Sequence, residues 1–148
     1  MEEKLSGMQD KTECTIYDKM KEVLKRNEYV QILGIEILEL EKGYCLGRMK
    51  KSRQILNPYE TMHGGSLYSL ADIVAGTAAC TYGHYVTTVN GSMNFLLPAK
   101  DTEYIQCEAK AVRQGKHLAV YDVVLSDDAG KELENGSFTF FVTEQQVI

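Results

Sequence analysis

The chain lacks the cysteine and histidine patterns that mark disulfide frameworks and metal sites. Its cysteines are widely spaced and include no CxxC pair, and its histidines show no metal-ligand spacing. The cysteines therefore read as small buried hydrophobes in a reducing compartment, and no metal is expected. The cysteines are Cys14, Cys45, Cys80 and Cys107, and the histidines are His63, His84 and His117.

An excess of positive charge is also missing. Lys and Arg total 16 against 21 Asp and Glu, a net charge of −5, and no basic stripe is present. This balance argues against nucleic acid as a partner. A polyanionic ligand stays open, because a few local Lys and Arg residues can hold phosphates.

Long hydrophobic runs are absent. The start, Met1 to Lys4, has no apolar core of a signal peptide, and the longest apolar stretch, residues 70–80, is too short to span a bilayer. We therefore expect no membrane association and a cytoplasmic protein.

At 148 residues the length predicts one domain, residues 1–148, with residues 1–11 disordered and an N-terminal helix over 12–28. A long helix is predicted over 65–82. The last four predicted strands follow one another and read as an antiparallel meander. The predicted strands cover residues 35–40, 44–51, 86–96, 102–114, 117–126 and 131–142.

The most informative segment runs from Asn57 to Asp72. A polar turn and the pair Gly64-Gly65 precede the long helix, which is apolar on nearly every face except for Asp72. A buried carboxylate costs several kcal/mol unless it is paired, so Asp72 has either a structural partner or a chemical use. The first N–H groups of the helix are unpaired donors with partial positive charge. A carboxylate and such donors are what acyl transfer requires, so this segment is predicted to be an active site.

With these residues the chain resembles the hotdog-fold acyl-CoA thioesterases of the phenylacetate-pathway (PaaI-like) group, in the 4HBT superfamily. The resemblance covers about residues 30–145 and rests on the spacing of a few short motifs. These are Asn57, His63-Gly64-Gly65, Asp72, residues 94–99 (Asn-Phe-Leu-Leu-Pro-Ala) and residues 113–116 (Arg-Gln-Gly-Lys). It implies an α+β hotdog fold, with an antiparallel sheet wrapped around one long central helix and an extra N-terminal helix.

The resemblance also implies roles for individual residues. Asp72 would be the general base or the nucleophile, and the N–H of Gly64 would polarise the thioester carbonyl. Asn57, His63 and Thr88 would complete the catalytic set by contacting the carbonyl or the attacking water. Residues that would bind substrate or coenzyme A are Gly65, Lys100, Arg113, Gln114, Gly115, Lys116 and His117.

Each of these residues also has a plain structural explanation. Asp72 would be a hydrogen-bonded buried carboxylate, and the glycines a tight turn before a helix. His63 and Asn57 would anchor or cap that turn, and Thr88 is an ordinary strand residue. The Lys, Arg and His residues would be scattered surface charges.

The implied activity is hydrolysis of an acyl- or aryl-acyl-CoA to a free acid and coenzyme A, with no cofactor. Family members pair so that active sites form at the interface, which implies a dimer or a dimer of dimers (a homotetramer). Asp72 and Thr88 would then come from one subunit, and Asn57, His63 and Gly64 from the other. The alternatives are a non-catalytic acyl-CoA-binding protein and an enoyl-CoA hydratase or dehydratase. One departure is Glu60, where the family often has glycine, which puts the position of Asn57 in question.

Overall fold

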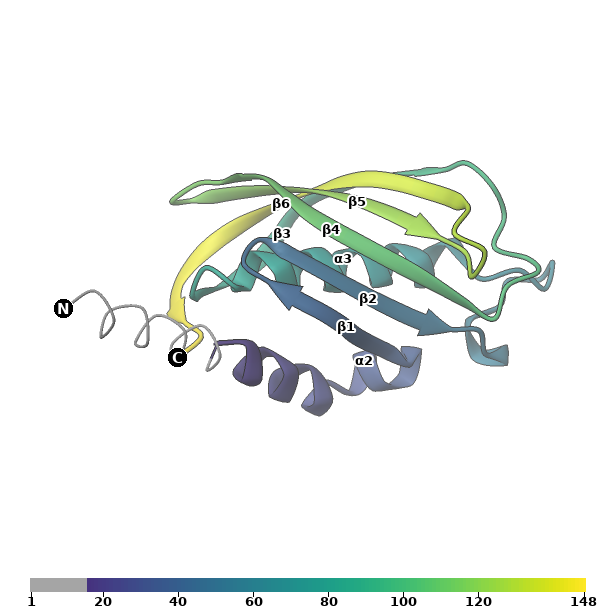
Figure 1. Cartoon of the computed structure of the whole chain (residues 1–148), viewed down its shortest axis with the longest axis horizontal. Helices are drawn as coiled ribbons and strands as arrows, with labels where there is room; N and C mark the ends of the chain where they lie inside the picture. Colours follow the sequence, from purple (N-terminus) through teal and green to yellow (C-terminus); the bar gives the residue numbers. More distant parts are fainter. Residues whose placement is uncertain (1–15) are drawn as a thin grey trace.

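The computed structural model describes residues 16–148 (Figure 1). Residues 16–26 are helical, which confirms that part of the predicted N-terminal helix. The predicted disorder of residues 1–11, the start of the helix at Thr12 and the environment of Cys14 lie outside the described residues. None of the helices within residues 16–148 is long and apolar enough to cross a membrane.

The predicted N-terminal helix is interrupted at Asn27. The Asn27 side chain accepts a hydrogen bond from the N–H of Val30 (3.3 Å) and so begins a separate short helix, α2 (Glu28–Leu33). Gly34 ends α2 in the left-handed conformation, with φ of 70°. Sequence reasoning missed α2, because the predicted helix ended at residue 28 and no element was assigned to residues 29–34.

Within residues 16–148, six antiparallel strands form one sheet. The strands are β1 (Ile35–Glu41), β2 (Tyr44–Lys50), β3 (His84–Phe95), β4 (Tyr104–Gln114), β5 (Leu118–Ser126) and β6 (Glu132–Gln146). A short 3-10 helix, η1 (Arg53–Ile55), follows β2 and leads to the long helix α3 (Gly64–Cys80). The existence of every predicted strand and of the long helix is confirmed.

The predicted order of the last four strands is wrong. The sheet order is β1-β2-β4-β5-β6-β3, so only β4, β5 and β6 form a meander. Strand β3 pairs with β6 and lies at the edge of the sheet. Helix α3 carries the chain from β2 across to this edge, and the loop after β3 carries it back to β4, which pairs with β2. This leaves an exposed edge strand that carries apolar groups such as Val89 (58% exposed) and Phe95 (53%).

Helix α3 lies against the inner face of the sheet (Figure 1). Leu70, Ala71, Val74, Ala75 and Ala78 of this helix are completely buried. A Cβ atom on Gly47 of β2 would lie 2.5 Å from Cγ2 of Val74, so the strand approaches the helix as closely as glycine allows. The small side chains therefore allow the close packing of sheet and helix that the sequence predicted. Cys45, Cys80 and Cys107 are buried free thiols, as expected.

Candidate active site

The loop that leads into α3 is fixed by the side chain of Asn57. Asn57 Oδ1 accepts from the N–H groups of Tyr59 (2.9 Å) and Thr61 (3.1 Å), and Asn57 Nδ2 donates to Oγ1 of Thr61 (2.6 Å). These bonds favour the turn-anchoring interpretation of Asn57. Nδ2 carries a second hydrogen, so the amide can still contact a ligand.

Glu60 occupies the position where glycine was expected, and it keeps a glycine-like backbone. Its φ is 64°, the only positive φ at a non-glycine position within residues 16–148. The loop therefore bends without glycine, and the N–H of Glu60 donates to the carbonyl of Asn57 (3.0 Å). The Glu60 side chain is exposed, and it does not line the cavity beside the start of α3.

His63 is the N-cap of α3, and it leaves one backbone donor free. Its Nδ1 accepts from the N–H of Gly65 (2.9 Å), and its carbonyl accepts from those of Ser66 (2.9 Å) and Leu67 (3.1 Å). The N–H of Gly64 has no acceptor within residues 16–148. Of the four N–H groups that begin α3, only that of Gly64 is therefore available to a ligand.

Asp72 forms a pair with Thr88. The Thr88 hydroxyl donates to Oδ1 of Asp72 (2.7 Å), which joins the middle of α3 to edge strand β3. Asp72 is half-buried in this chain, not enclosed as its apolar neighbours in the sequence suggested. Oδ2 receives no hydrogen bond from the described residues, so this oxygen can act on a water molecule or a substrate.

One chain does not bring Asp72 and Gly64 together. They are eight residues apart on one helix, which separates them by about 12 Å along its axis at 1.5 Å per residue. A general base and an oxyanion donor must both lie within about 3 Å of the groups they serve. The two halves of the predicted site are therefore formed separately within this chain.

The predicted coenzyme A-binding turn lies still farther away. Arg113 and Gln114 end β4, and residues 115–117 connect it to β5 near the C-terminal end of α3, whereas Gly64 begins that helix (Figure 1). Gln114 accepts a hydrogen bond from the hydroxyl of Tyr121 (2.6 Å), and the N–H of Gly115 donates to the carbonyl of Leu118 (2.9 Å). Gln114 and Gly115 thus shape the turn.

The cationic side chains of this turn are exposed. Arg113 and Lys116 form no ion pair within residues 16–148, and His117 is exposed beside them. Lys100 lies elsewhere, because its carbonyl accepts from Nζ of Lys51 (3.2 Å) close to the N-terminal end of α3. The same chain therefore cannot place Lys100 and the 113–117 turn on one phosphate group.

A cavity of about 340 Å³ lies beside the free N–H of Gly64. It is bounded by the loop before α3, the first turn of α3 and the segment that follows β3. The lining residues are Asn57, Thr61, Met62, Gly64, Leu67, residues 95–99 and Glu134.

Sequence reasoning missed Glu134, which lines this cavity from β6. Glu134 is 2% exposed, burial raises its pKa to about 7, and its Oε2 has no hydrogen-bond partner within residues 16–148. A signal was present in the sequence. Phe138 and Phe140 alternate on the inner face of β6, and extending this period of two backwards places Gly136 and Glu134 on the same face.

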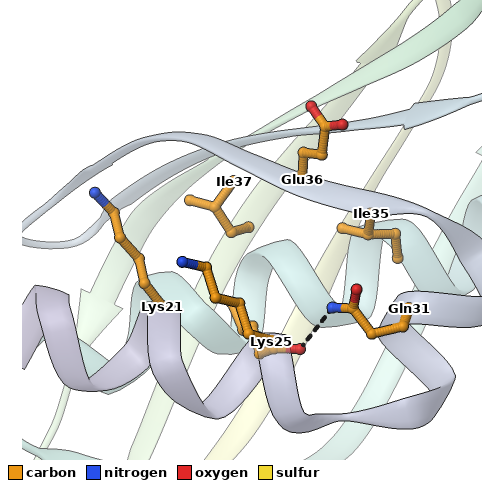
Figure 2. A pocket seen from close by; sticks show the side chains of 7 residues that line it. Lys21, Lys25, Gln31, Ile35, Glu36 and Ile37 are labelled. Carbon is orange, nitrogen blue, oxygen red and sulfur yellow. Dashed lines mark hydrogen bonds between the residues drawn. The ribbon is translucent and has the colours of Figure 1, made fainter.

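A second cavity lies at the β1 edge of the sheet. Figure 2 shows it between the helix of residues 16–26, α2 and β1, with Lys21 and Lys25 extending from the helix. Strands β1 and β3 are opposite edges of the sheet, so this cavity is not part of the predicted site.

Comparison with known proteins identifies the family. The family model named thioesterase superfamily matches residues 59–134. The chain belongs to the thioesterase superfamily. The acyl-coenzyme A thioesterase PaaI of Escherichia coli is 30% identical over 99 residues, 67% of this chain and 71% of that protein. Human acyl-coenzyme A thioesterase 13 is 31% identical over 124 residues, 81% of this chain and 89% of that protein.

Solved structures agree with this assignment to the superfamily. The structure of E. coli PaaI matches with a TM-score of 0.84 at 23% identity, covering 88% of this chain and 95% of that chain. A hypothetical thioesterase protein of Streptococcus pneumoniae, solved with coenzyme A, matches with a TM-score of 0.71 at 30% identity, covering 75% of this chain and 87% of that chain. The PaaI-like resemblance, the hotdog fold and the enzyme class of thioester hydrolase are thus confirmed. The roles assigned to individual residues stay predictions.

Proposed function

We propose that this thioesterase hydrolyses an acyl-CoA to a free acid and coenzyme A at a site shared between two subunits. The observation that carries the proposal is the single free N–H at the start of α3, that of Gly64, beside a cavity. It is the donor that an oxyanion requires. The relatives named acyl-coenzyme A thioesterases and the structural neighbour solved with coenzyme A support the substrate class.

A second subunit would complete the site. An isologous two-fold pairing along the exposed edge strand β3 would set the two α3 helices antiparallel. Asp72 and Thr88 of one subunit would then approach Gly64, His63 and Asn57 of the other. The separation of about 12 Å between Asp72 and Gly64 within one chain supports this arrangement.

The chemistry follows from these positions. Oδ2 of Asp72 takes a proton from a water molecule whose oxygen forms the new bond to the carbonyl carbon, while Thr88 holds Oδ1. The negative charge that develops on the carbonyl oxygen is stabilised by the N–H of Gly64 and by the positive end of α3. When the C–S bond breaks, the thiolate of coenzyme A takes up a proton. Direct attack by Asp72 through an acyl-enzyme anhydride would use the same groups.

The same pairing accounts for the distant cationic turn. Antiparallel helices bring the C-terminal end of one α3 near the N-terminal end of the other. Arg113, Lys116 and His117 would therefore come from the subunit that supplies Asp72, and Lys100 from the subunit that supplies Gly64. Exposed, unpaired cations suit the phosphates of coenzyme A, which reconciles an acidic protein with an anionic ligand.

Mixed assemblies test the shared site. Two inactive variants, Asp72→Asn and Gly64→Pro, are co-expressed with different affinity tags, and assemblies that contain both are purified. A shared site restores one intact centre per mixed dimer, so we expect about half of the parental thiol release. If the mixed assemblies are as inactive as each variant alone, each site lies within one chain.

Two simpler measurements complete the test. Light scattering at micromolar concentration is expected to give a dimer or a dimer of dimers, and a fully active monomer would contradict the proposal. An acyl-CoA panel followed by free thiol distinguishes hydrolysis from mere binding. Absence of thiol release together with hydration of an enoyl-CoA would instead indicate a hydratase. The cytoplasmic location stays a prediction.

A further inference from the structure

The buried carboxyl group of Glu134 has no function in the mechanism above. It belongs to the inward-facing row of β6, where its companions are Gly136, Phe138 and Phe140. A polar group on such a face costs free energy unless it is hydrogen-bonded. Glu134 is nevertheless 2% exposed, and no donor within residues 16–148 reaches its Oε2.

The surroundings of Glu134 within the sheet are apolar. Leu125 is its partner on β5, and Phe95 is its partner on β3. The nearby ionisable group on β4 is the thiol of Cys107, whose pKa is raised first by burial and further by Cys45, Glu134 and Glu108. No cation pairs with this carboxyl group within the described residues. The sheet alone therefore does not account for it.

Glu134 and Gly64 line the same cavity. Directly opposite residues on paired strands have Cβ atoms about 4.5–5.5 Å apart, and Phe95 stands opposite Glu134 in this way. The ring of Phe95 in turn lies against Gly64, since a Cβ atom there would be 3.4 Å from Cε1 of Phe95. Glu134 is thus one side chain away from the free N–H.

The acyl group is the part of the substrate that enters this cavity, a step that rests on the proposed function. The cationic turn for the nucleotide lies at the other end of the same chain, so the coenzyme A part leads out towards the second subunit. Apolar groups of Met62, Leu67 and Phe95 line the cavity where the acyl group would lie next to the thioester carbonyl. A volume of about 340 Å³ lies at the small end of ligand pockets, which suits a short acyl group.

We propose that Glu134 is a specificity-determining residue that hydrogen-bonds a hydroxyl group on a short acyl chain. The enzyme then prefers hydroxyacyl-CoA substrates to unsubstituted acyl-CoA of the same length. A hydroxyl group both donates and accepts, so it pairs with either protonation state of a carboxyl group. Both states are available near neutral pH, because burial raises the pKa of Glu134 to about 7.

Matched substrates test the proposal. The release of thiol from butyryl-CoA, 2-hydroxybutyryl-CoA and 3-hydroxybutyryl-CoA gives a kcat/KM ratio of hydroxylated to plain substrate for each hydroxyl position. We expect the parent protein to prefer one hydroxylated substrate by about 10-fold or more, the effect of one well-placed hydrogen bond. Both substrates are measured on the same preparation, so the ratio does not depend on the fraction of folded protein.

Three variants separate recognition from structural support. Glu134→Leu should bring the ratio close to one. Glu134→Gln, which keeps two hydrogen-bonding atoms, should retain part of the preference. Glu132→Leu is the matched control, because Glu132 is an exposed carboxylate two residues away, and it should leave the parental ratio unchanged.

The outcomes distinguish this inference from the function on which it rests. If the parent protein releases thiol from plain and hydroxylated substrates equally well, only the proposed role of Glu134 is refuted. An equal loss on plain and hydroxylated substrates in Glu134→Leu does the same, and shows that the carboxyl group only supports the fold. No thiol release from any substrate in the parent protein refutes the acyl-CoA thioesterase proposal, and this inference falls with it.

Discussion

Replacement of Gly64 by proline removes the proposed oxyanion donor and little else. Gly64 is the first residue of α3, where proline fits well because its missing N–H and fixed φ suit the start of a helix. The preceding residue, His63, already has the extended conformation that proline requires before it, with φ of −63° and ψ of 133°. The bonds that cap the helix come from Gly65, Ser66 and Leu67 and are preserved.

The expected effect is large and specific to turnover. Loss of one oxyanion donor lowers kcat by roughly 100- to 1,000-fold, or about 2.7–4 kcal/mol. KM should change little, because this hydrogen bond strengthens mainly in the transition state. The matched control is Gly64→Ala, which adds the same Cβ atom against the ring of Phe95 at 3.4 Å but keeps the N–H.

Steady-state thiol release with an accepted acyl-CoA measures both variants, and urea unfolding confirms that both are folded. Gly64→Ala should lie within a few-fold of the parent protein. If Gly64→Pro turns over as fast as Gly64→Ala, the N–H of Gly64 is not the oxyanion donor, and the assignment of this helix end is wrong.

Four further changes test separate parts of the molecule. Asp72→Asn should lower kcat by about 100-fold or more while binding of coenzyme A stays nearly constant. If this variant turns over as fast as the parent protein, Asp72 is a structural residue. Lys116→Ala should raise KM about 5- to 30-fold with little change in kcat. The rise in KM should be smaller at high salt, and it should be absent with a short thioester that lacks the nucleotide. Lys131→Ala, at the turn between β5 and β6, is its control and should change neither constant. Glu60→Gly should stabilise the fold by about 0.5–1 kcal/mol in urea unfolding, because it relieves the left-handed backbone, whereas Glu60→Ala should not. Burial raises the pKa of Glu134 from 4.5 to about 7, so its contribution to stability is present below pH 4.5 and is lost as the pH rises through 7. This loss amounts to about 3 kcal/mol, and thermal unfolding of Glu134→Gln should show a weaker decline over that range, whereas identical pH profiles would refute the buried acid.

Local pattern in the sequence was sufficient for most secondary structure. The run of small and apolar residues located α3 within two residues at each end, because a helix that is apolar on nearly every face shows itself in its composition. Turn residues separated the strands correctly for the same local reason. The short helix α2 was missed because its start depends on a single cap, the side chain of Asn27.

Long-range pairing was not readable in this way. The edge position of β3 depends on which strands compete for β2 and β6, and neither the length nor the periodicity of β3 records that choice. Glu134 was readable in principle from the period of two in β6. It was overlooked because a charged residue beside exposed Glu132 looks like a solvated strand end until its burial is known.

The sequence by itself determined the fold class, the family and the residue types available for chemistry, because these follow from local patterns and short motifs. Only the tertiary structure decided where those residues lie. It pairs Asp72 with Thr88, leaves the N–H of Gly64 free and keeps these two groups about 12 Å apart. The reason is physical: a rigid helix fixes the distance between its residues, and the packing of the sheet against it decides which of its polar groups find a partner.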